Sequence, residues 1–125
     1  TWTLENTPAP DESIPMPVVS GAFMLMSKAG FDQLGGFDED YFLHVEDVDI
    51  CRRATEAGGA VIYCPHAGAL HYGSTSEAPS ATVARHKADS LVHYFRKFAS
   101  SPFERALVAL LAPVLKAATI ARARK

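Results

Sequence analysis

Asp47 is the side chain whose position in this sequence best suits acid–base chemistry. Residues 45–58 have the apolar period of an amphipathic helix. At about 100° per residue, Asp47 falls in the middle of the apolar side as its only charge, near the first turn. A carboxylate placed there can act as a general base in a cleft. It can also be a structural acid satisfied by the free N–H groups of the first turn, and the sequence leaves both interpretations open.

Two further acids flank Asp47 on the side of the helix that we expect to face solvent. Glu46, Asp47 and Asp49 place three carboxylates within four residues, a pattern that suits a cation but is also common where helices start. We therefore expect Asp49 to pair with Arg53 at i+4.

His71 is the histidine whose surroundings differ most from those of a surface side chain. It lies among small and apolar residues at the end of a predicted strand. Such an imidazole is either a hydrogen-bonded core residue or a ligand of a divalent metal.

Short strands and helices are expected to position these residues. Residues 17–27 are apolar almost throughout, which predicts a buried strand. Ser20-Gly21-Ala22 interrupts this strand, and glycine there marks either a ligand close to the backbone or tight packing against another element. The remaining expectations are a helix at 28–34 ending at Gly35-Gly36, a loop at 37–44, a helix end at Gly58-Gly59 and strands at 60–64 and 67–72.

The C-terminal part of the chain predicts two helices. The first covers residues 81–99, and the second runs from 103 toward 121, kinked or broken at Pro113. The apolar stripe of the first helix consists of Ala84, Ala88, Leu91, Phe95 and Phe98.

Composition and charge limit the class of protein. The chain has 125 residues, of which 48% are apolar and 21% charged, so it is long enough for one small globular domain and is not a disordered chain. Residues 1–77 hold 3 Lys/Arg and 12 Asp/Glu, whereas residues 78–125 hold 9 and 2, which gives net charges of −9 and +7. We expect an extended linker at 1–16, an acidic part at 17–77 and a basic helical segment at 78–125. The two cysteines have no metal-site spacing and are expected to be free.

Four motifs together resemble the C-terminal part of a family 2 glycosyltransferase, and most closely its bacterial rhamnosyltransferase-like members. They are Ser-Gly-Ala at 20–22, Gly-Gly-Phe-Asp-Glu at 35–39, Glu-Asp-x-Asp at 46–49, and the Pro65 and His71 that follow on strands. The resemblance covers residues 20–76. It implies an α/β fold class, a partial GT-A (nucleotide-diphospho-sugar transferase) fold in which a few strands and an ED-bearing helix precede two C-terminal helices.

The resemblance also implies an activity and roles for individual residues. Members transfer a sugar from a nucleotide-diphosphate donor to an acceptor hydroxyl, with inversion at the anomeric carbon, in the synthesis of cell-surface polysaccharide or glycolipid. Asp47 matches the catalytic base, and His71 matches a ligand of the Mn²⁺ or Mg²⁺ that holds the donor diphosphate. The residues expected to bind substrate are Ser20, Gly21, Ala22, Glu46 and Asp49.

The family's nucleotide-binding βαβ units and its strand-end Asp-x-Asp have no counterpart here. We therefore expect a fragment of a longer enzyme that is inactive alone. Residues 103–125 suggest either a helix packed on the rest of that enzyme or one lying on an anionic membrane surface. We expect a cytoplasmic location, at the inner face of the cell membrane if that surface is used, and no nucleic acid partner. Homo-oligomerisation, a non-catalytic partner- or membrane-binding module, and a metal-dependent hydrolase using His71 with Asp47 stay open as alternatives.

Overall fold

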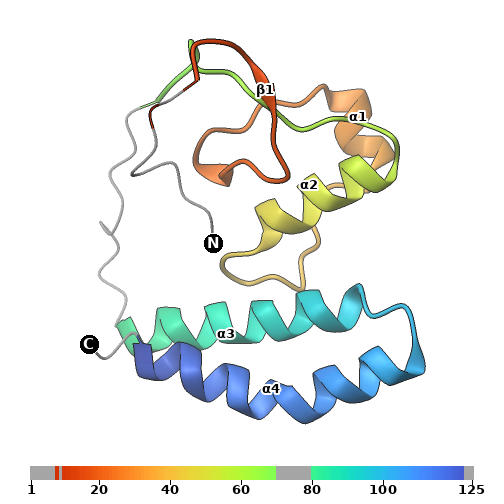
Figure 1. The fold of residues 1–125 in the computed structure, drawn as a ribbon, viewed down its shortest axis with the longest axis vertical. Coiled ribbons are helices and arrows are strands. Elements are labelled where there is room, and N and C mark those ends of the chain that lie inside the picture. Colours follow the sequence, from red (N-terminus) through yellow and green to blue (C-terminus); the bar gives the residue numbers. More distant parts are fainter. Residues whose placement is uncertain (1–7, 9, 70–79, 123–125) are drawn as a thin grey trace.

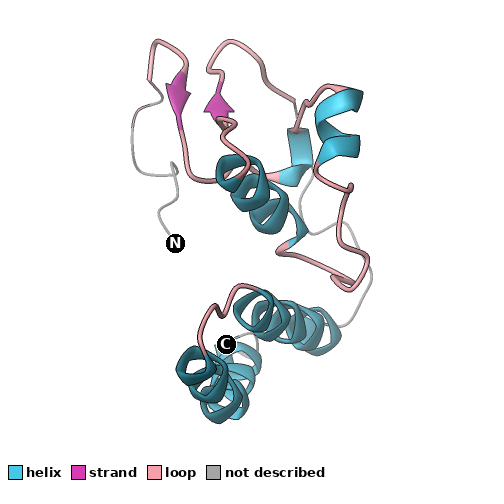
Figure 2. Ribbon diagram, turned by 90° about the vertical axis from the view of Figure 1, so that its right-hand side faces the viewer, coloured by secondary structure: helices cyan, strands magenta, loops and turns pink. Residues whose placement is uncertain are grey.

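The computed structural model describes residues 8, 10–69 and 80–122. Two groups of elements make up this part of the chain (Figures 1 and 2). The N-terminal group holds both strands, a 3-10 turn and two short helices, and the C-terminal group is a hairpin of two long helices. In chain order the elements are β1 (Ile14–Pro15), η2 (Gly21–Phe23), α1 (Lys28–Gln33), α2 (Glu46–Glu56), β2 (Ile62–Tyr63), α3 (Ser80–Lys97) and α4 (Pro102–Arg122).

The sheet is smaller than the sequence predicts. β1 and β2 form one antiparallel pair, in which Ile14 is opposite Tyr63, and the Met16 N–H continues the ladder to the Val61 carbonyl at 2.9 Å. The strand predicted at 17–27 is wrong, because this segment contains η2 and pairs with no strand in the described residues. Its side chains are half-buried or exposed rather than buried, with Leu25 94% exposed. An apolar run predicts burial, but the described residues provide no second layer to cover this one.

Glycines end the two short helices, as the sequence predicts, and a serine that the sequence analysis did not single out begins the first of them. Ser27 caps α1 by accepting a hydrogen bond from the Gly30 N–H at 3.1 Å. Gly35 and Gly36, with φ of 79° and 74°, then end α1 in the left-handed conformation that glycine adopts without strain. Gly58, with φ of 83°, does the same after α2.

The two C-terminal helices are confirmed. Of the two outcomes predicted for Pro113, a kink or a break, the break does not occur, because α4 runs through this residue as a continuous helix. It begins with a capping box, in which the Ser101 hydroxyl accepts from the Glu104 N–H at 3.1 Å while Glu104 accepts from the Ser101 N–H at 3.1 Å. The predicted stripe on α3 is partly right, because Ala84 and Ala88 are buried whereas Phe95 is exposed.

The buried side chains lie on both sides of α2 and between α3 and α4, and Cys51 on α2 reaches the Val19 carbonyl. The apolar ones are Tyr41, Val45, Ile50, Cys51, Ala84, Ala88, Val92, Ala99 and Ala112, and two polar ones, Asp49 and Ser90, are buried with them. Both cysteines are free, as expected, with Cys51 buried and Cys64 exposed. Within the described ranges no helix has the length and apolarity needed to cross a bilayer. The strand predicted at 67–72 does not form at 67–69, and its remainder and the domain boundary near 77 fall outside the described residues.

Candidate functional site

The carboxylate of Asp47 lies in the first turn of α2 and is half-buried. Its Oδ2 accepts a hydrogen bond from the Gly21 N–H at 3.0 Å, and its Oδ1 accepts one from the Val48 N–H at 2.8 Å. Both of these donors are backbone groups. A carboxylate oxygen has more than one lone pair, so each oxygen keeps capacity for a further donor.

The turn at Ser20-Gly21-Ala22 packs directly against Asp47. A Cβ placed on Gly21 would lie 3.3 Å from the Cβ of Asp47 and 3.7 Å from its Oδ2, so a larger residue would push the two segments apart by a few tenths of an ångström. Ser20 shapes the turn by accepting a hydrogen bond from the Ala22 N–H at 3.3 Å. Tight packing, one of the two explanations that the sequence allowed for this glycine, is present here, and the element it packs against is the one that bears Asp47.

An open hollow of about 370 Å³ begins at Gly21. Its lining is mostly apolar and consists of Gly21, Met24, Met26, Lys28, Phe31, Phe37 and Ile50. We call it the Gly21 hollow. Asp47 is not itself a lining residue, but its half-buried carboxylate is joined to the rim of the hollow through the Gly21 N–H.

The backbone that leads into α2 is strained. His44 and Val45 have φ of 66° and 75°, the left-handed region that β-branched residues rarely adopt. Each such residue costs about 1–3 kcal/mol and persists only where surrounding contacts impose it. Val45 is buried and precedes the helix without a side-chain cap, so packing fixes where α2 begins and therefore where Asp47 points.

Glu46 has an incompletely satisfied side chain. The residue is half-buried, and its Oε2 is buried without a hydrogen-bond partner among the described residues. An unpaired buried acceptor is costly, and no described residue offsets this cost for Glu46.

Asp49 is fully buried, which contradicts the expectation that it faces solvent. The predicted pairing with Arg53 is confirmed, with the guanidinium 2.6 Å from Oδ2. Two further groups contact the other carboxylate oxygen of Asp49. The Tyr41 hydroxyl donates a hydrogen bond to Oδ1 at 3.2 Å, and the Lys97 ammonium lies 2.7 Å from the same oxygen. The error has a physical cause: the polar side of α2 is covered by α3 and by the loop before α2, which the period of α2 does not reveal.

Arg53 ties this buried carboxylate to the loop after α1. Its guanidinium also donates to the carbonyls of Leu34 and Gly36, at 2.5 and 2.9 Å. One side chain therefore fixes the Gly35-Gly36 turn against α2.

Lys97 joins three segments of the chain. Its ammonium lies 2.6 Å from Asp38 Oδ2 as well as 2.7 Å from Asp49, so it bridges the loop before α2 and α2 itself to α3. His93, one turn earlier on α3, approaches the same Asp38 oxygen at 3.2 Å and packs edge-on against the Tyr41 ring. Burial would lower the pKa of Lys97, but its hydrogen bonds to Asp38 and Asp49 outweigh that effect and raise it.

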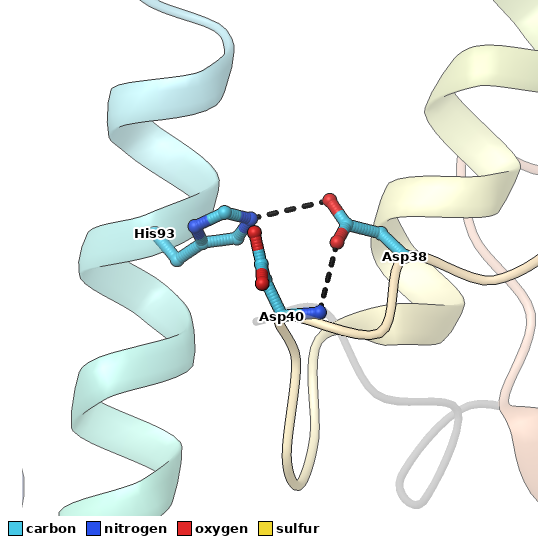
Figure 3. A group of neighbouring side chains, drawn as sticks. All are labelled: Asp38, Asp40 and His93. Carbon is cyan, nitrogen blue, oxygen red and sulfur yellow. Dashed lines mark hydrogen bonds and ion pairs between the residues drawn. The ribbon is translucent and has the colours of Figure 1, made fainter.

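Asp38, Asp40 and His93 are near enough to one another to ligate a metal ion (Figure 3). However, the Lys97 ammonium already contacts the Asp38 oxygen that faces His93, and an ammonium there disfavours a second cation. Burial alone would raise the pKa of Asp38, but hydrogen bonds from Lys97, the Asp40 N–H and His93 lower it well below its usual range. We therefore interpret the cluster as an ion-paired structural network. Sequence reasoning missed it because 55 residues separate Asp38 from His93.

His71, the residue expected to bind a metal, lies outside the described residues. Near Asp47, the described residues offer one free buried oxygen, Oε2 of Glu46, which is a ligand type that Mn²⁺ and Mg²⁺ accept. One oxygen does not make a site, so the metal stays a proposal.

Comparison with known proteins now decides the family. Residues 9–91 match the model of a family described as "Glycosyltransferase like family 2". The chain belongs to this family. It is 40% identical over 74 residues to an N-acetylglucosaminyl-diphospho-decaprenol L-rhamnosyltransferase of Mycobacterium tuberculosis, a match that covers 58% of this chain and 24% of that protein. It is 38% identical over 73 residues to the Rhamnosyltransferase WbbL of Escherichia coli, which covers 55% and 28%. The chain thus spans about a quarter of the length of these relatives, and no solved structure matches it.

The family 2 glycosyltransferase motifs separate into two groups in space. Ser20, Gly21 and Ala22 meet Asp47 beside the Gly21 hollow, and Glu46 precedes Asp47 in the first turn of α2. Asp49 does not join them, because it points into the interface with α3.

Proposed function

We propose that this chain is the acceptor-side part of an inverting glycosyltransferase, with Asp47 as its general base. The observation that supports this most is the half-buried Asp47 carboxylate, which the Gly21 N–H holds beside an open hollow. Because both of its hydrogen-bond donors in the described chain are backbone groups, the carboxylate is oriented without being neutralised by a cation.

The proposed reaction is a single displacement at the anomeric carbon of a nucleotide-diphospho-sugar. An acceptor hydroxyl attacks from the face opposite the leaving group, and Asp47 takes the hydroxyl proton as the new C–O bond forms. The bond from the anomeric carbon to the donor diphosphate breaks, and the nucleoside diphosphate leaves with the electron pair.

The proposed acceptor is a carbohydrate carried on a lipid, in the synthesis of cell-surface polysaccharide or glycolipid. Support comes from the name of the Mycobacterium tuberculosis relative, which specifies a diphospho-decaprenol-linked sugar. A bound Mn²⁺ or Mg²⁺, with His71 as one ligand, would neutralise charge on the departing diphosphate.

Substitution of Asp47 in the full-length enzyme tests the proposal. Asp47→Asn keeps the size of the side chain and an acceptor for the Gly21 N–H but removes the base, so the turnover number should fall by about 10²–10⁴. The matched control is Asp11→Asn, the same change at an exposed position, which should leave transfer unchanged. Unfolding temperatures of the three proteins show whether the fold survives. An Asp47→Asn enzyme that transfers sugar at the unsubstituted rate would make this residue a structural acid.

The isolated chain is a second test. We propose that it neither binds donor tightly nor transfers sugar alone, because most of the length of its relatives has no counterpart in it. Transfer measured with the isolated chain would contradict this.

A further inference from the structure

A second hollow, of about 260 Å³, lies between the loop before α2 and one face of α3, and we call it the Phe42 hollow. It shares no lining residue with the Gly21 hollow. The loop contributes Asp40 and Phe42, and Figure 3 shows Asp40 on this loop opposite His93 on α3. The polar lining residues of α3 have the spacing of one helix face, and they are His86, Asp89, Ser90, His93 and Arg96.

Phe42 presents an aromatic ring at this hollow on a fixed piece of backbone. Its side chain is 76% exposed, although both of its neighbours in the chain are held in place. Tyr41 is buried, and the Leu43 carbonyl accepts a hydrogen bond from the Ser90 hydroxyl at 2.9 Å. The Phe42 ring lies against the His86 ring, with 4.3 Å between the ring centroids and 35° between the ring planes. The loop therefore holds an apolar surface that a ligand can contact without rearrangement of the backbone.

The charged groups of the Phe42 hollow cancel. Asp89 and Lys116 pair with each other across α3 and α4, with 2.6 Å between carboxylate and ammonium. The Asp40 carboxylate and the Arg96 guanidinium have no hydrogen-bond or ion-pair partner within the described ranges, so one acceptor group and one donor group are left for a ligand. Two acids beside two bases disfavour both a metal ion and an inorganic anion, because each would meet charges of its own sign. A neutral ligand with many hydrogen-bonding groups fits this lining best.

We propose that the Phe42 hollow binds one pyranose unit of a neutral saccharide. One face of a pyranose ring consists of C–H groups that pack against an aromatic ring, whereas its hydroxyls both donate and accept hydrogen bonds. Phe42 supplies the aromatic ring, the Asp40 carboxylate accepts from hydroxyls, and the Arg96 guanidinium donates to them. The volume suits a single ring, since pockets for drug-sized ligands hold about 300–1,000 Å³. The inference goes beyond the proposed function, because no residue of the Asp47 site lines this hollow.

Ligand-observed saturation-transfer NMR with the full-length protein tests the proposal without any measurement of sugar transfer. The probes are the methyl glycosides of glucose, galactose, mannose and N-acetylglucosamine, each added alone. We expect at least one of them to bind, with the strongest saturation on the C–H protons of one ring face. Binding of none of the four would overturn the proposal.

Substitution of Phe42 locates the bound sugar. Phe42→Ala removes the aromatic ring and should weaken binding of the glycoside by about tenfold. Phe103→Ala is the matched control, because Phe103 is 75% exposed but does not line the hollow, and it should bind as the unsubstituted protein does. A glycoside held only at the Asp47 site would bind both variants equally, and that result would overturn the proposal.

Substitutions of the two unpaired charged groups separate a sugar from an anion. Asp40→Asn and Arg96→Gln each remove one charge at an exposed position and should each weaken glycoside binding by about fivefold to tenfold. Circular dichroism checks that the helices are kept, and these two variants keep the test valid if Phe42→Ala does not fold. Inorganic phosphate alone is the competing probe. Phosphate binding that Arg96→Gln abolishes and Asp40→Asn strengthens, with glycoside binding unchanged in both, would overturn the proposal.

Discussion

The two sides of α2 bear aspartates of opposite character. Asp47 is half-buried, accepts hydrogen bonds from backbone N–H groups and adjoins an open hollow. Asp49, two residues later, is fully buried between Arg53, Lys97 and the Tyr41 hydroxyl.

This difference fits the proposed division of one motif into a base, Asp47, and a positioning residue, Asp49. A carboxylate that two cations and a hydroxyl already satisfy has little capacity left to take a proton from a substrate, but it fixes the helix that bears it. Asp49 therefore acts as an anchor that joins α2 to α3 and to the loop before α2. Asp47 is the one of the two that remains free to react.

Removal of the Asp49 charge should produce the largest change in stability. Asp49→Asn leaves Arg53 and Lys97 without a shared counter-charge in a buried site, so the free energy of unfolding should fall by about 3–5 kcal/mol. Asp47→Asn should change it by less than about 1 kcal/mol, because the amide oxygen still accepts from a backbone N–H. Urea unfolding of both variants compares them directly. Equal losses of unfolding free energy in the two variants would contradict the distinction drawn between Asp47 and Asp49.

Substitution of Lys97 should have the next largest effect. Lys97→Met keeps the length of the side chain but removes the charge shared by Asp38 and Asp49, at a cost of about 2 kcal/mol. Lys28→Met is the control, because Lys28 pairs with Asp32 on the surface, where such pairs contribute less than about 1 kcal/mol. Unfolding curves that coincide for the two variants would show that the bridge does not stabilise the fold.

A methyl group on Gly21 tests the other side of α2. In Gly21→Ala the new Cβ presses on Asp47 from 3.3 Å, so the carboxylate must shift, and transfer should fall about tenfold with little loss of stability. In Gly68→Ala the added Cβ meets nothing within 4 Å, and transfer should not change. If both alanine variants transferred sugar equally well, the close approach of Gly21 would be irrelevant to catalysis.

Acidification should have the smallest effect on stability. It should act through the ion pairs of Asp38, which lie on the side of α2 that faces α3. Because the pKa of Asp38 is lowered in the fold, its contribution to stability is complete above the unfolded value of about 3.9 and is lost as pH falls through the folded value. The stability difference between the unsubstituted protein and Asp38→Asn should therefore shrink below about pH 4. A difference that stayed constant down to the acid transition would contradict the assigned ion pairs.

The helices were predictable because their signals are local. Gly35-Gly36 and Gly58 end α1 and α2 where expected. The pairing of Asp49 with Arg53 is also local, at i+4.

Long-range contacts were not predictable from one sequence. A helical period shows which residues share a face but not what covers that face, so the burial of Asp49 under α3 was missed. The same limit hid the contact of Asp38 with His93. The apolar run at 17–27 gave the wrong element because apolar content does not distinguish a paired strand from an extended segment with a 3-10 turn.

Turnover measured for Asp47→Asn and Asp49→Asn in the full-length enzyme, at a temperature where both remain folded, tests the central claim most directly. We expect the Asp47 variant to lose about 10²–10⁴ in turnover number with its unfolding temperature preserved. The Asp49 variant should keep most of its turnover and lose stability instead. The reverse pattern, with catalysis abolished at Asp49 and retained at Asp47, would contradict the account.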